Sequence, residues 1–165
     1  MLRVLMKSSG VTWKSVVFTF VVALVFYVVA WSWMTRRQTG QGPWQVGFGT
    51  NAAGVPQLTV QQIALGISNV TVRFAGESLG TNVSGAVVFT KPQLRVPFGR
   101  VAYDDLMFQP GSVVLDCFGH LVELLPRDLG LNGQATPWRS GEEYTLWPTN
   151  KLSEEARKKL KGGYR

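Results

Sequence analysis

The chain has 165 residues, a length that accommodates one ordinary domain and little besides. Apolar residues make up 45% of it and charged residues only 16%, against about 25% charged in typical soluble proteins. This composition argues against intrinsic disorder and against a coiled coil, and the shortage of charge indicates contact with a membrane. One cysteine and one histidine exclude an internal disulfide, a thiolate zinc cluster and a multi-histidine site, so we expect no metal and no other cofactor.

The formal net charge of +7 is concentrated at the two ends of the chain. Residues 1–37 contain five basic residues and no acidic one, and residues 149–165 contain six basic residues against two acidic ones. Residues 38–148 contain six basic and eight acidic residues instead. A domain that binds nucleic acid needs a basic face for phosphate contacts, so we expect no nucleic-acid partner.

Residues 1–14 form a basic tail, and residues 15–35 are predicted to form a transmembrane helix. No residue from Ser15 to Thr35 is charged, and this length of helix covers about 30 Å, the thickness of the hydrocarbon core of a bilayer. Aromatic and basic side chains at both ends suit the two membrane interfaces. The expected anchor residues are Trp13, Lys14, Trp31, Trp33, Arg36 and Arg37.

Two other interpretations of this segment compete with a membrane anchor. A helix buried in a soluble core would need other helical sequence around it, and the chain has too little. A cleaved signal peptide is the stronger alternative, because basic residues precede the apolar run and Val28 to Ala30 offers a cleavage site. The apolar run continues past that site through Trp31 and Trp33, which favours an uncleaved signal anchor in a single-pass protein.

More basic groups precede the apolar segment than closely follow it, which favours a cytoplasmic N-terminus by a narrow margin. We therefore expect a protein of the cytoplasmic (inner) membrane whose C-terminal domain is periplasmic or extracellular.

A short linker at 36–42 leads into residues 43–148, which are predicted to form a β-rich domain. Apolar and polar residues alternate in several short runs, as they do in strands with one buried face. The alternating runs are centred on Val46, Val72 and Val96, and further short β-rich runs lie at 113–117, 121–125 and 144–147. Pro92 and Pro97 place the third of these runs at a sheet edge, because proline cannot donate to a strand ladder.

Turn clusters separate these runs at spacings typical of all-β domains. They predict seven or eight strands in a small antiparallel β-sandwich or barrel-like fold. Residues 59–65 are ambiguous: Thr59 and Gln62 match a helix capping box, but a bulged strand is slightly favoured.

Residues 149–165 form a basic tail in which Ser153 to Leu160 predicts a short helix capped by Ser153. The favoured interpretation is a solvated, frayed segment. A basic arm that contacts lipid head groups or an acidic partner is the alternative. Its candidate contacts are Arg157, Lys158, Lys159 and Lys161.

No side-chain pattern in the chain predicts catalysis strongly. Cys117 and His120 could act as nucleophile and base only if Phe118 and Gly119 formed a hairpin turn, and that turn would give Phe118 an unfavourable positive φ. We therefore expect a buried thiol and a histidine at the rim of the domain. Asp104 and Asp105 are expected to solvate a loop, because neighbouring residues of a strand point in opposite directions.

The predicted function is that of a noncatalytic accessory or scaffold protein, anchored in the bilayer, which presents a β-rich domain to a partner protein of the envelope. A tethered module that binds glycan or cell-wall polymer through Trp138, Tyr144 and Trp147 is the alternative. A small Cys/His hydrolase or metal-binding protein is a more remote one. The sequence leaves the oligomeric state open.

Overall fold

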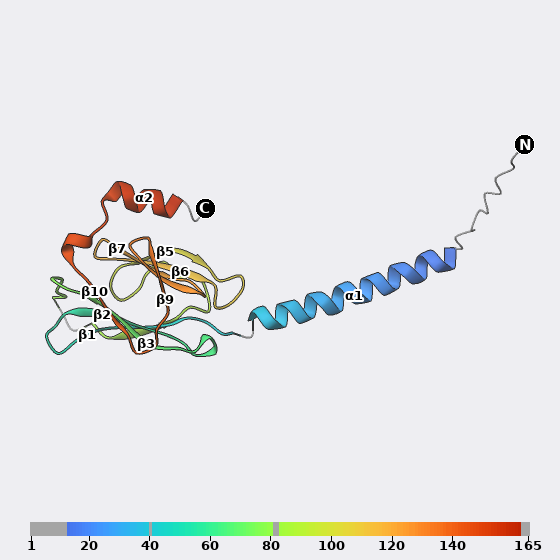
Figure 1. Cartoon of the computed structure of the whole chain (residues 1–165), viewed down its shortest axis with the longest axis horizontal. Helices are drawn as coiled ribbons and strands as arrows, with labels where there is room; N and C mark the ends of the chain where they lie inside the picture. Colours follow the sequence, from blue (N-terminus) through green and yellow to red (C-terminus); the bar gives the residue numbers. More distant parts are fainter. Residues whose placement is uncertain (1–12, 40, 81–82, 163–165) are drawn as a thin grey trace, which may run out of the picture. The chain divides into compact units, whose positions relative to one another are not determined.

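The computed structural model describes residues 13–39, 41–80 and 83–162, with the side chains of residues 35–39 and 161 excepted. The chain divides into two compact units, Met1–Gln38 and Thr39–Arg165. The first unit contains one long helix, and the second contains two sheets and a short C-terminal helix (Figure 1). The prediction of a mainly β fold behind one N-terminal apolar helix is confirmed.

The long helix α1 spans Trp13–Thr39, and its described side chains are exposed along its length. Its stretch Trp13–Met34 is long and apolar enough to cross a membrane, although a signal sequence would share these features. The helix continues beyond Thr35 to Thr39, so most of the predicted linker is helical. The side chains of Arg36 and Arg37 lie outside the described residues.

We call the second unit the β domain, and its described residues contain ten strands rather than the seven or eight predicted. Sheet A has the order β10-β3-β2-β1-β4, with β1 at Gln45–Thr50, β2 at Pro56–Gln62, β3 at Ile67–Phe74, β4 at Gly85–Val88 and β10 at Glu143–Leu146. Sheet B has the order β5-β6-β7-β8-β9, with β5 at Arg100–Asp105, β6 at Ser112–Cys117, β7 at His120–Leu124, β8 at Asp128–Leu131 and β9 at Gln134–Pro137. All pairings are antiparallel except the parallel pair of β10 and β3.

The two sheets pack face to face as a sandwich, and one apolar core lies between them (Figure 1). Alternate residues of β1 and of the second half of β3 enter the core, as the sequence pattern predicts: Val46 and Phe48 from β1, and Val70, Val72 and Phe74 from β3. Phe98 packs edge-on against Phe48, with ring centroids 5.1 Å apart.

The predicted edge strand around Val96 is wrong. Residues 91–99 run irregularly, with one isolated bridge between Arg95 and Arg100, and Leu94 is exposed. Only Phe98 of the alternating set is fully buried. The two prolines explain the difference, because they remove ladder donors at positions where a regular strand would need them.

The ambiguous region at residues 59–65 combines both of the expected structures. Strand β2 has a bulge between Val60 and Gln62, and a one-turn 3₁₀ helix, η1 (Ile63–Leu65), follows it. The capping residue of η1 is Gln62 rather than Thr59, since the Gln62 side chain accepts a hydrogen bond from the Ala64 N–H at 3.0 Å.

A second 3₁₀ turn, η2 (Pro148–Asn150), leads to the C-terminal helix α2 at Glu154–Gly162. The Ser153 hydroxyl accepts a hydrogen bond from the Ala156 N–H at 3.2 Å, which confirms the predicted cap. Helix α2 belongs to the same compact unit as the sheets and lies over sheet B (Figure 1).

Candidate functional site

The hairpin between β6 and β7 turns at Phe118 and Gly119, which have φ values of 54° and 87°. The sequence argument against this turn was therefore wrong. The Phe118 ring packs against the rings of Phe74 and Phe98, with centroids 5.3 and 5.5 Å away. This aromatic contact offsets the cost of a left-handed phenylalanine, which the local sequence alone does not show.

The turn makes Cys117 and His120 direct cross-strand partners. The Cys117 thiol donates to the Phe98 carbonyl at 3.4 Å, and burial raises its pKa to about 12. At neutral pH the sulfur therefore stays a thiol, whereas nucleophilic catalysis needs a thiolate.

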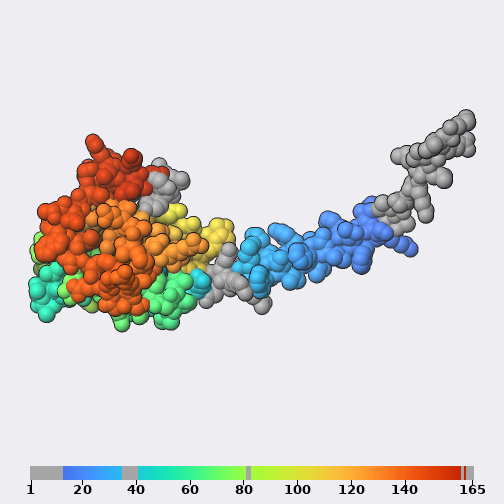
Figure 2. Space-filling model, viewed as in Figure 1, coloured from blue at the N-terminus to red at the C-terminus, as the bar shows by residue number. Residues whose placement is uncertain are grey.

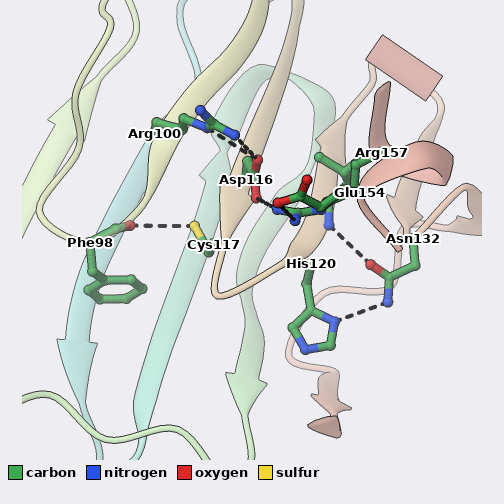
Figure 3. Close-up of polar contacts among 9 residues, drawn as sticks. Phe98, Arg100, Asp116, Cys117, His120, Asn132, Glu154 and Arg157 are labelled. Carbon is green, nitrogen blue, oxygen red and sulfur yellow. Dashed lines mark hydrogen bonds and ion pairs between the residues drawn. The ribbon is translucent and has the colours of Figure 1, made fainter. Parts of the chain in front are cut away.

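The His120 ring is held by Asn132 on the turn between β8 and β9, as Figure 3 shows. The Asn132 amide nitrogen lies 3.1 Å from Nδ1 of His120 and also donates to the Asn150 carbonyl at 2.8 Å. Burial, followed by the nearby Lys151 ammonium, lowers the pKa of His120. Within the described residues Nε2 of His120 is buried without a hydrogen-bond partner, so the geometry is that of a packed neutral ring rather than a base aligned on the thiol.

Asp116 is the centre of a charged cluster on the outer side of sheet B (Figure 3). Its carboxylate is almost fully buried and accepts hydrogen bonds from Nη2 and Nε of Arg100 at 3.0 and 3.2 Å. From α2, Nη1 of Arg157 lies 3.5 Å from the other carboxylate oxygen, and Glu154 lies within 3.8 Å of Arg157. The cluster fixes α2 to the sheet, and sequence reasoning missed it because its members are far apart in the chain.

The cluster corrects the expectation of a solvated, partly frayed tail, and it pairs Arg157, one of the predicted lipid or partner contacts, with Asp116. The Arg157 side chain is only 20% exposed and is committed to Asp116. Lys158 and Lys159 are exposed on α2, and the side chain of Lys161 lies outside the described residues.

The carboxylates of Asp104 and Asp105 have structural partners in neighbouring loops. Asp104 accepts from the Gln93 N–H at 3.2 Å, and Asp105 accepts from the Met107 N–H at 3.2 Å, so both carboxylates brace loops. Within residues 13–39, 41–80 and 83–162, no group of three or more His, Cys, Asp or Glu side chains could hold a metal ion.

The three candidate glycan-binding aromatics do not share one exposed face. Trp138 packs against Trp44 with ring centroids 5.3 Å apart, and its indole N–H donates to the Leu125 carbonyl at 2.8 Å. Tyr144 is half-buried and donates to Glu142, which leaves Trp147 as the exposed member of the set. The arrangement supports core packing for Trp138 and Tyr144.

The outer face of sheet A carries a shallow groove of about 260 Å³. It exists because Gly47 has no side chain between its neighbours on β2 and β4. Glutamine, threonine and small apolar residues line it, with no charged group: Gln45, Val46, Gly47, Thr59, Gln61, Ala86, Val87 and Val88. Within the described residues, this groove is one concave surface of the β domain, and a smaller one of about 100 Å³ is lined by Arg100, Glu154, Arg157 and Lys158.

No protein-family profile, curated protein or solved structure matches this chain.

Proposed function

We propose that this is a noncatalytic accessory or scaffold protein, anchored in the cytoplasmic membrane by α1, which presents the β domain to an envelope partner protein on the periplasmic or extracellular side. The observation that carries the proposal is the pairing of an apolar helix long enough to span a bilayer with a compact β-sandwich on the same chain. The buried thiol of Cys117 favours this role over a hydrolase. The packing of Trp138 against Trp44 and the hydrogen bond from Tyr144 to Glu142 favour it over a glycan-binding module.

The partner surface that fits this role is the groove on sheet A. Its uncharged amide and hydroxyl groups can exchange hydrogen bonds with a polypeptide, and its small residues let a partner segment approach the sheet closely. The outer side of sheet B is less suitable, since α2 already lies over it.

Two exposed alanines on edge strands provide a matched test of this surface. Ala86 lines the groove on β4, and Ala135 lies on β9 of sheet B. The full chain, extracted in mild detergent from its native membrane, should retain a stoichiometric partner. Ala86→Lys should reduce partner recovery about tenfold or more because it places a charge in the contact, whereas Ala135→Lys should retain the partner. A monodisperse, partner-free monomer would contradict the proposal.

The orientation has its own test. Protease added to intact spheroplasts should digest the β domain, because the proposal places it outside the cytoplasmic membrane. A domain that stays fully protected until the membrane is disrupted would refute this orientation.

A further inference from the structure

We propose that the end of the β domain at which the chain enters from α1 rests on the bilayer, and that Ile63, Met107 and Phe108 insert into the interfacial layer of the lipid. We call these three residues the entry rim. The proposal rests on the proposed function, since it requires α1 to be a membrane span. It adds a lipid-contact surface on the β domain itself.

Buried Gln62 ties the first part of the entry rim to the incoming chain. Its amide nitrogen donates to the Gly42 carbonyl at 2.8 Å and to the Pro43 carbonyl at 3.2 Å. Its amide oxygen caps η1, which begins with Ile63. The Ile63 side chain is 76% exposed, and the cap holds its backbone beside the entry point.

The loop between β5 and β6 supplies the other two residues of the entry rim. The Trp44 indole N–H donates to the Gly111 carbonyl at 3.0 Å, which ties this loop to the first residues of the β domain. Asp105 accepts from the Met107 N–H and braces the loop from within. Met107 is 78% exposed and Phe108 is 44% exposed. In the space-filling view this yellow loop projects from the β domain (Figure 2).

Glycine is required where this loop returns to the sheet. Gly111 has a φ of 66°, and a Cβ atom there would lie 2.0 Å from the Asp105 carbonyl oxygen. The pairing of Asp105 with Ser112 holds the two ends of the loop together, so Met107 and Phe108 are presented on a braced loop.

The tether between the helix and the entry end is short. Helix α1 ends at Thr39, and Gly42 is already bonded to Gln62. Three peptide links reach at most about 10 Å, so the connection between Thr39 and Gly42 is short. Such a short connection gives the entry rim a high effective concentration at the lipid surface.

Charge does not explain attraction of this end to lipid, so apolar contact is the source of the interaction that we propose. Asp104 and Asp105 lie at the end of β5, next to Met107 and Phe108, so the rim contacts should form on zwitterionic lipid. Isoleucine, methionine and phenylalanine side chains gain free energy when they leave water for the acyl boundary.

The test places an environment-sensitive dye on the full chain in nanodiscs of phosphatidylcholine. Ile63→Cys and Met107→Cys probe the entry rim. Leu94→Cys and Ala53→Cys are matched controls, since both are exposed and lie away from the entry end: Leu94 bonds to Val101 at the opposite end of β5, and Ala53 lies in the turn between β1 and β2. Native Cys117 is buried and should not react while the β domain is folded.

We expect the dye at positions 63 and 107 to show blue-shifted emission and at least twofold stronger quenching by lipids that carry shallow doxyl groups than at positions 94 and 53. Equal, water-like signals at all four sites, in a chain that remains in the nanodisc, would overturn the entry rim and leave the anchor intact. Quenching that appears only with anionic phosphatidylglycerol would also overturn it. A chain that does not remain in nanodiscs would instead refute the anchor.

Discussion

The outer faces of the two sheets differ in what lies over them. On sheet B, outward residues such as Val114, Asp116 and Leu121 are almost fully buried, and Arg157 of α2 reaches Asp116 there. On sheet A, outward residues such as Gly47 and Thr59 border an open groove. The difference teaches that α2 is an integral layer of the β domain, and that the groove on sheet A stays open among the described residues.

The test with the largest expected effect introduces the same new residue on the outer face of each sheet. Val114→Asp would bury a second carboxylate opposite Glu123, the cross-strand partner of Val114, and should lower the free energy of unfolding by at least about 4 kcal/mol. Thr59→Asp should change it by less than about 1 kcal/mol, because the new side chain can reach water. Urea unfolding of the full chain in mild detergent, followed by circular dichroism, measures both. Equal costs would mean that the two faces are covered alike.

The second test removes the buried charge that fixes α2. Asp116→Asn leaves Arg157 without its main counter-charge and should lower the free energy of unfolding by about 3 kcal/mol. Glu154→Gln is the control, since its carboxylate is 80% exposed and should contribute less than about 0.5 kcal/mol. The same unfolding measurement applies, and an Asp116→Asn variant as stable as the parent would show that α2 docks by other contacts.

Local sequence patterns predicted much of the fold but little of this difference. The long helix, the strands around Val46, Val72 and Leu115, and the Ser153 cap depend on residue periodicity and neighbours, so the sequence shows them. The Phe118 turn depends on packing against Phe74 and Phe98, which lie far away in the chain.

The candidate surfaces were harder still to predict. The groove depends on the pairing of β1 with β4, and the Asp116 cluster joins residues from three elements. The entry rim depends on hydrogen bonds from Gln62 and Trp44 to distant backbone groups. No period along the sequence contains this information.

A third test uses pH to probe the core between the sheets. The pKa of Cys117 is about 12 in the folded protein, against 9.0 for an ordinary thiol. The unfolded chain therefore loses its thiol proton first, so stability is retained below pH 9 and is lost as the pH rises toward 12. At pH 10 the parent should lose about 1.5 kcal/mol more than Cys117→Ala, relative to pH 8. If the free energies of unfolding of the two proteins change with pH in parallel, the Cys117 thiol is exposed to water.

The smallest expected effect concerns the start of α2. Ser153→Ala removes the hydroxyl that accepts from the Ala156 N–H and should cost about 0.5 to 1 kcal/mol. Ser153→Asp keeps an acceptor and should restore stability to near the parental value. If both variants unfold like the parent, the cap contributes nothing to the docking of α2.

Alkaline carbonate extraction of native membranes, followed by intact-mass measurement of the chain, tests the central claim most directly. A membrane anchor predicts that the chain stays in the pellet with its N-terminal apolar segment uncleaved. Release of the β domain into the supernatant, or a mass that lacks residues up to about Ala30, would contradict the claim.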